Sequence, residues 1–66
     1  MMKFIMEFEM NNAAFTQNPE GEAARILNYI AKKLIRGDVY GNIMDYNGNS
    51  VGTWDIDAQD DFDEEF

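Results

Sequence analysis

The sequence contains no cysteine and no histidine. Without cysteine the chain cannot form a disulfide, a thiolate zinc site or a thiol nucleophile. Without histidine it lacks the commonest metal ligand and general base. It also has no apolar run close to the ~20 residues of a membrane-spanning helix, and it lacks the apolar region and cleavage site of a signal peptide. We therefore expect a cytoplasmic protein that is not an enzyme, binds no metal or other cofactor and does not contact a membrane.

Basic residues are scarce, because five Lys and Arg stand against thirteen Asp and Glu, for a net charge of −8. Residues 1–54 hold five basic and six acidic residues, a net charge of −1. The other seven acids lie in the last twelve residues: Asp55, Asp57, Asp60, Asp61, Asp63, Glu64 and Glu65. The sequence thus indicates a nearly neutral domain over residues 1–57 and an acidic C-terminal tail over residues 58–66.

The chain has 66 residues, of which 45% are hydrophobic and nine are aromatic. A chain of this length buries only roughly 60% of its unfolded surface when it folds. This length and this composition predict one small domain with a thin hydrophobic core.

Three segments show the periodicity of secondary structure. Residues 3–10 alternate between apolar and mostly charged positions, which predicts a half-buried strand. From Pro19 to Arg36 the apolar residues recur at helical spacing, after the capping residue Asn18 and before Gly37, which suits a left-handed C-terminal position. Residues 39–45 and 49–57 read as a hairpin around Asn47-Gly48.

A two-residue loop at Asn47-Gly48 would pair Tyr46 with Asn49, Ile43 with Gly52 and Gly41 with Trp54. The two strand glycines then leave room for the side chains of Trp54 and Ile43. One face of the hairpin would carry the core residues. The other face would be unusually apolar, with Tyr40, Asn42, Met44, Tyr46, Val51 and Thr53.

The order strand, helix, strand, strand predicts a two-layer α+β domain with one helix on a three-stranded sheet. The first strand can lie beside the third, which makes the sheet antiparallel, or beside the second in a right-handed parallel unit. We favour the antiparallel sheet.

Several residue patterns could support chemistry. The loop from Asp45 to Ser50 has oxygen ligands at calcium-loop spacing, but Ser50 replaces the required glycine and Ile56 the bidentate glutamate, so we favour a plain hairpin turn. The pairs Glu7 with Glu9 and Asp55 with Asp57 fall on exposed strand faces, where we expect solvated charges rather than the enclosed surroundings that acid/base catalysis needs. A stripe of cations on the helix could contact phosphates, be an ordinary solvated face, or hold the acidic tail: Arg25, Lys32, Lys33 and Arg36.

The last six residues are Asp61-Phe62-Asp63-Glu64-Glu65-Phe66. They resemble the acidic tips of bacterial and phage single-stranded-DNA-binding proteins, whose terminal phenylalanine docks on partner enzymes. That resemblance implies an accessory protein whose tail recruits replication or repair enzymes.

The chain also resembles a loose class of very short phage and prophage proteins, over about residues 3–56. The resemblance rests on Asn11-Asn12-Ala13-Ala14-Phe15, Ala24-Arg25-Ile26-Leu27 and Asn47-Gly48-Asn49-Ser50-Val51-Gly52. In size and acidity this class is similar to anti-CRISPR and anti-restriction proteins, several of which imitate nucleic acid. The resemblance implies action in the cytoplasm of a host cell.

The leading hypothesis is a phage-type inhibitor that binds a host protein with a basic nucleic-acid-binding groove, with no direct contact to nucleic acid. Its candidate partner-binding residues are Glu7, Glu9, Asp55, Asp57, Asp60, Asp61, Phe62, Asp63, Glu64, Glu65 and Phe66. The alternative is a homodimeric interaction or assembly module. Its candidate dimer face is Tyr40, Met44, Tyr46 and Val51.

Overall fold

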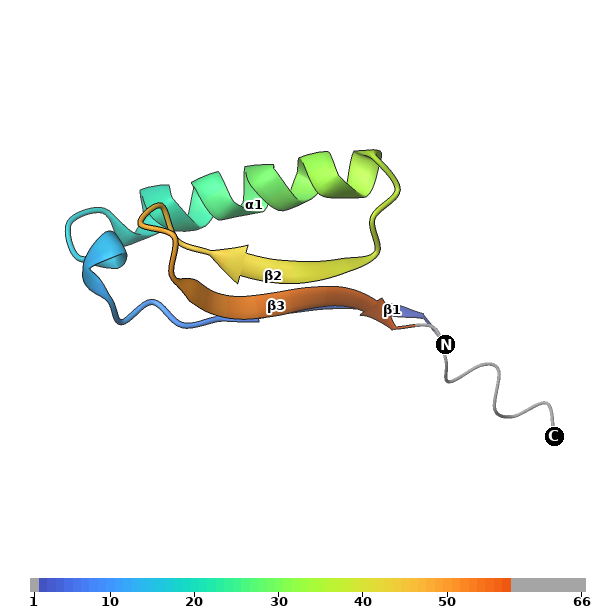
Figure 1. Ribbon diagram of the computed structural model, residues 1–66, viewed down its shortest axis with the longest axis horizontal. Helices are drawn as coiled ribbons and strands as arrows, with labels where there is room; N and C mark the ends of the chain where they lie inside the picture. The colour runs from blue at the N-terminus through green and yellow to red at the C-terminus, as the bar shows by residue number, and fades with distance from the viewer. Residues whose placement is uncertain (1, 58–66) are drawn as a thin grey trace, which may run out of the picture.

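The single α-helix of the described chain, α1 (Pro19–Ile35), forms one layer of a two-layer α+β structure (Figure 1). The computed structural model describes residues 2–57. Asn18 caps the helix by accepting a hydrogen bond from the Gly21 N–H at 3.1 Å, and Gly37 adopts a φ of 103° just after its end. The capping signals in the sequence therefore located both ends, with Arg36 as the C-terminal cap rather than the last helical residue.

The second layer is a three-stranded antiparallel sheet in the order β1-β3-β2. Its strands are β1 (Lys3–Phe8), β2 (Tyr40–Met44) and β3 (Ser50–Asp57), and a short 3-10 helix, η1 (Ala13–Phe15), follows β1. The predicted fold class and the favoured antiparallel arrangement are confirmed. Along the chain, α1 follows β1, packs over one face of the sheet and leads to β2. The last strand, β3, then lies between β1 and β2 in the sheet (Figure 1).

The hairpin of β2 and β3 has the predicted register along its strands but a different turn. Ile43 faces Gly52 and Gly41 faces Trp54, as expected. The expected pair Tyr46 with Asn49 is wrong, because Asp45 faces Asn49 and donates its N–H to the Asn49 carbonyl at 3.0 Å. A two-residue turn of the expected type needs positive φ at both Asn47 and Gly48, and only Gly48 has it, at 88°. A β-bulge between Ile43 and Met44 then restores the register along the strands.

The sheet face that points toward α1 carries three rows of residues. Two rows cross all three strands, and the third crosses β1 and β3 and ends at Val39, the residue before β2. The row at the hairpin end and the central row contain the buried Ile43 and Trp54, which pack with Ile26 and Ile30 of α1. The third row, which we call the end row, lies where β3 ends. From β1 to β2, the rows are Phe8, Gly52 and Ile43, then Met6, Trp54 and Gly41, and finally the end row of Phe4, Ile56 and Val39.

The two strand glycines are required by close approach. A Cβ at Gly41 would come within 2.9 Å of Trp54 Nε1, so this glycine makes room for the indole ring as expected. A Cβ at Gly52 would overlap the backbone carbonyl of Glu7 on β1. The space at Gly52 is therefore taken by the neighbouring strand, not by Ile43 as the sequence suggested.

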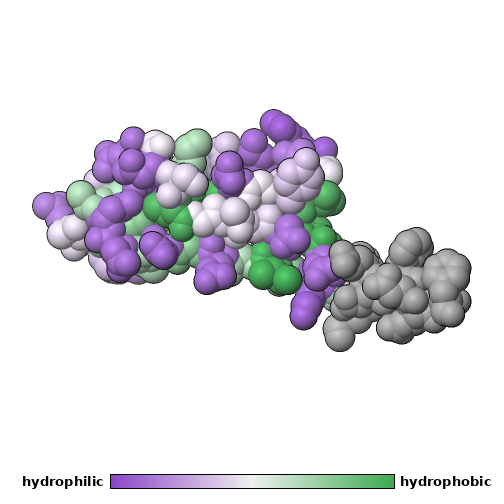
Figure 2. All heavy atoms as spheres, turned by 60° about the horizontal axis from the view of Figure 1, so that its bottom comes forward, coloured by the Kyte–Doolittle hydropathy of each residue, from purple (hydrophilic) through white to green (hydrophobic). Residues whose placement is uncertain are grey.

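The opposite side of the sheet, which we call the open face, is more polar than the sequence predicted. Val51 packs against the core, because the bulge changes the alternation of β3 at this residue. Tyr46 lies in the hairpin turn beside α1. The view from this side shows mainly hydrophilic residues with small separate hydrophobic areas (Figure 2). The open face consists of Lys3, Ile5, Glu7, Tyr40, Asn42, Met44, Thr53, Asp55 and Asp57.

Candidate protein-binding face

Three carboxylates share the open face, and two strands position them. Asp55 and Asp57 are two residues apart on β3, so their side chains emerge on the same face about 7 Å apart. Glu7 of β1 faces Thr53, and it is therefore the diagonal neighbour of Asp55 at a typical separation of about 7–8 Å. The alternation of two neighbouring strands thus produces a spaced acidic group on the surface.

Two large apolar side chains flank the central carboxylate of this group. Asp55 faces Ile5 on β1 and Tyr40 on β2, which are 40% and 75% exposed. A shallow depression of about 450 Å³ lies beside Tyr40 and Asp55, and Asn42 and Thr53 also line it. Such a surface can accept hydrogen bonds from a lysine or arginine while an apolar side chain covers part of the cation's stem.

The fourth predicted acidic residue of the domain lies at the margin of this group. Glu9 follows β1 and donates its backbone N–H to the Val51 carbonyl at 2.9 Å, with an exposed side chain. A second hollow of about 230 Å³ lies between Glu7 and Glu9. The remaining predicted partner-binding residues lie outside the described residues: Asp60, Asp61, Phe62, Asp63, Glu64, Glu65 and Phe66.

The predicted dimer face does not form one surface. Tyr40 and Met44 are exposed on β2, with 75% and 51% of their surface accessible. Tyr46 is exposed but lies beside Glu22 and Arg25 at the N-terminal half of α1, while Val51 packs against the core. The grouping of these four residues is therefore wrong. It assumed a two-residue turn, in which Tyr46 and Val51 continue the alternation of their strands. In the structure Tyr46 belongs to the turn, and the β-bulge brings Val51 to the core side.

The cations of α1 and its C-terminal cap Arg36 lie on the other layer of the molecule, and three of them contact neighbouring side chains. Arg25 donates to both carboxylate oxygens of Glu22 at 2.8 Å, Lys33 lies 5.1 Å from the centre of the Tyr29 ring, and Arg36 is 3.3 Å from Asp38. These four cations thus lie away from the carboxylates of the open face, where Lys3 is the cation and faces Asp57.

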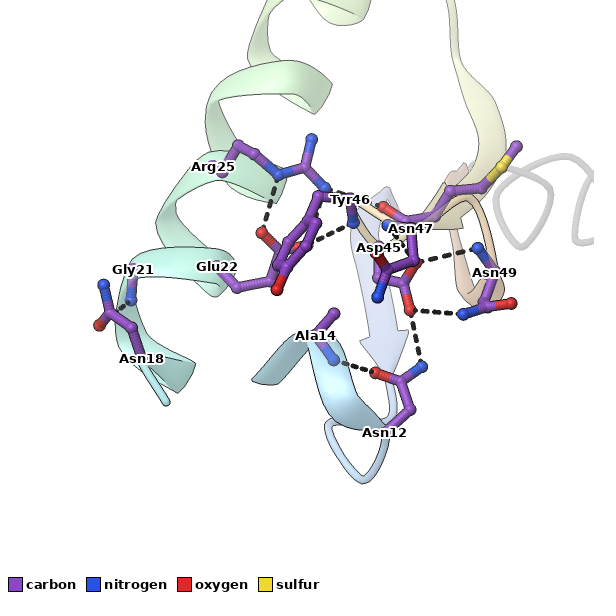
Figure 3. Close-up of polar contacts among 11 residues, drawn as sticks. Asn12, Ala14, Asn18, Gly21, Glu22, Arg25, Asp45, Tyr46, Asn47 and Asn49 are labelled. Carbon is purple, nitrogen blue, oxygen red and sulfur yellow. Dashed lines mark hydrogen bonds and ion pairs between the residues drawn. The ribbon is translucent and has the colours of Figure 1, made fainter. Parts of the chain in front are cut away.

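Asp45 is the first residue of the loop with calcium-loop spacing, and its carboxylate already accepts four hydrogen bonds. It is 4% exposed, and it accepts from the N–H groups of Asn47 and Asn49 at 2.9 Å and from the side chains of Asn49 and Asn12 at 3.2 and 2.7 Å (Figure 3). Burial alone would raise the pKa of Asp45, but the hydrogen bonds from Asn49, Asn12 and Asn47 together lower it. The structure supports the plain hairpin turn. Among residues 2–57 no group of three or more acidic side chains is arranged to hold a metal ion.

Glu22 is a structural carboxylate that the sequence analysis did not identify. It is buried in α1, pairs with Arg25, and accepts the Tyr46 N–H at 2.9 Å, so it fastens the helix to the hairpin turn (Figure 3). The hydrogen bond from Arg25 lowers the pKa of Glu22, and this outweighs the opposing effect of burial. The three-residue spacing of Glu22 and Arg25 was the available signal, but nothing local indicated the contact with Tyr46.

Comparisons with protein-family models, curated proteins and solved structures found no match to this chain. Within residues 2–57 there is no helix with the length and apolar character needed to cross a membrane.

Proposed function

We propose that this chain is a non-enzymatic inhibitor of the phage type. It binds a host nucleic-acid-handling defence protein, such as a CRISPR effector or a restriction component, and blocks the basic surface that normally holds nucleic acid. Glu7, Asp55 and Asp57 imitate phosphates on the open face, and the acidic residues after Asp57 extend the same charge along the partner.

The observation that carries this proposal is the location of the carboxylates on the open face. They stand at intervals of about 7 Å on two rigid, hydrogen-bonded strands, so they present charge without first having to be ordered. The acidic stretch that starts at residue 60 comes three residues after the end of the strand that carries two of them. A basic groove meets these charges on one side of the molecule, away from the cations of α1.

Charge also favours a protein partner over nucleic acid. A molecule with a net charge of −8 repels nucleic acid at long range, and four cations between residues 25 and 36 are a small number of phosphate contacts. A basic protein surface attracts the same molecule and accelerates its association at low salt.

The test is capture of proteins from a bacterial host lysate by three forms of the full-length chain. The first is the unchanged protein and the second is the variant Glu7→Gln/Asp55→Asn. The third is the control Glu20→Gln, which removes an exposed acid from the other layer. Added DNA is used to compete for the captured protein.

We expect the unchanged protein and the control to retain a nucleic-acid-binding protein that DNA displaces. The open-face variant should bind it about tenfold more weakly, which corresponds to about 1.4 kcal/mol. Equal capture by all three forms, or a captured protein that DNA does not displace, would show that the open face does not imitate nucleic acid.

A further inference from the structure

The end row is an apolar surface that points toward the helix layer and yet stays exposed. Phe4 is 46% exposed and Val39 50%, whereas Trp54 in the adjacent row is 2% exposed. Phe4 packs one side of its ring against Trp54, with ring centroids 6.1 Å apart. Side chains on the inner face of a sheet normally lie under the opposite layer, so this exposure indicates that the end row accepts an additional apolar group.

We propose that the C-terminal segment 58–66 of the same chain binds the end row. An aromatic ring of this segment covers Phe4, Ile56 and Val39, while the neighbouring carboxylates lie beside the cations at the end of α1. This concerns the free protein and does not depend on the proposed partner.

The position of the chain end supports this occupant. Ile56 is itself a member of the end row, and the segment begins two residues after it. Phe62 is five residues beyond Asp57, which allows a reach of about 17 Å, and Phe66 can reach about 30 Å. Three adjacent strands span only about 9.5 Å from first to last, so either ring can return to any part of the row.

The chemistry of the segment matches the chemistry of this end of the domain. The segment contains two phenylalanines, five acidic residues and no basic residue. Lys33 belongs to the last turn of α1 and Arg36 is its C-terminal cap, and this end of α1 lies at the same end of the molecule as the end of β3 (Figure 1). They line a shallow groove of about 220 Å³ together with Tyr29 and Lys32. The end row therefore suits the apolar rings of the segment, and the groove at the end of α1 suits its carboxylates.

A different hollow adjoins the end row at Val39. It has a volume of about 400 Å³ and is lined by Gly37, Asp38, Val39 and Tyr40 in the connection from α1 to β2. Because the segment is tethered to Asp57, its effective concentration at these surfaces is in the millimolar range. Weak apolar and charged contacts are therefore enough to hold it on its own domain.

The experiment compares backbone amide spectra of the ¹⁵N-labelled full chain and of the full-length variant Phe62→Ser/Phe66→Ser. The substitutions lie outside residues 2–57 and leave the described contacts of the domain unchanged. We expect the largest chemical shift changes at Phe4, Val39 and Ile56. The matching internal control is the hairpin end, represented by Ile43 and Asn49, where the amides should not move.

Two results would overturn the proposal. In one, the substitutions change the amide chemical shifts of the end row no more than they change those of the hairpin end. In the other, the end-row shifts of the unchanged protein vary with protein concentration, which would mean that the segment binds a second copy. Raising the salt from 0.1 to 1 M shortens the Debye length from about 10 to 3 Å, so the end-row shifts of the unchanged protein should also move toward those of the variant.

Discussion

Glu22 of α1 accepts the backbone N–H of Tyr46 at 2.9 Å, across 24 residues of sequence. The same carboxylate holds Arg25, whose guanidinium also reaches the Met44 carbonyl at 3.1 Å. On the other side of the turn, Asn12 donates to Asp45 at 2.7 Å and accepts the Ala14 N–H at 3.1 Å. Two buried carboxylates thus join the helix, η1 and the hairpin turn, at the end of the domain opposite the end row.

Replacing the buried carboxylate of α1 should destabilise the domain. In Glu22→Gln the amide nitrogen replaces either Oε1, which accepts from Arg25, or Oε2, which accepts from both Arg25 and Tyr46. At least one hydrogen bond loses its acceptor and the ion pair disappears, so we expect a loss of about 1–3 kcal/mol in the free energy of unfolding. Urea denaturation measures this loss. The control Glu20→Gln removes an exposed charge from the same helical turn and should change stability by less than about 0.5 kcal/mol. Equal losses in the two variants would contradict the structural role of Glu22.

The same pair of variants should reveal a pH dependence. The folded state lowers the pKa values of Glu22 and Asp45 below their ordinary 4.5 and 3.8, so the unfolded chain binds more protons in acid and low pH favours unfolding. This stabilisation is complete above about pH 5 and is lost as the pH falls through the folded pKa values. The stability gap between the unchanged protein and Glu22→Gln should therefore be largest near pH 7 and narrow below about pH 4.5. A gap that stays constant from pH 7 to pH 3 would show that the charge of Glu22 is not what holds the turn.

Two glycine substitutions should differ in severity. Gly52→Ala places a methyl group on the backbone of β1 and should cost about 1–3 kcal/mol or more, because neither strand can move without breaking the pairing. Gly48→Ala meets open space and carries only the strain of a φ of 88°, about 1–2 kcal/mol. Thermal denaturation of both variants shows which substitution lowers stability more. A larger loss of stability in Gly48→Ala would contradict the close approach of β3 to β1.

The position of Val51 can be tested against an exposed neighbour. Val51→Ala removes packing against the core and should cost about 1 kcal/mol, whereas Met44→Ala changes an exposed side chain and should stay within about 0.5 kcal/mol. Denaturant midpoints of the two variants provide the comparison. If Met44→Ala were the more damaging change, the bulge would not turn Val51 inward.

Calcium should leave the thermal midpoint unchanged. The Asp45 carboxylate already accepts four hydrogen bonds, and a bound ion would have to displace them. Magnesium at the same concentration controls for ionic strength. A rise in midpoint with calcium alone would mean that the turn rearranges into an ion-binding loop.

Local patterns were sufficient for most of the fold. Asn18 and Gly37 marked the ends of α1, and Gly41 and Gly52 fell opposite the large residues that the register required. The alternation of residues 3–10 marked the first strand, although β1 ends at Phe8. These signals work because helical capping and strand alternation depend on neighbours only a few residues away. The concentration of acidic residues after Trp54 was likewise visible in the sequence alone.

Other features depend on how distant segments meet. The contacts of Glu22 with Tyr46 and of Asn12 with Asp45 join residues 24 and 33 positions apart, and no local pattern encodes such a pair. The bulge at Val51 depends on the turn that the chain adopts at Gly48, and one extra residue there reversed the side on which Val51 lies. Composition and periodicity assigned residues to elements, while the docking of α1 and η1 onto the sheet determined which carboxylates are buried and which apolar row remains exposed. The physical reason is that burial depends on where the opposite layer comes to rest, and its position is the result of all the long-range contacts together.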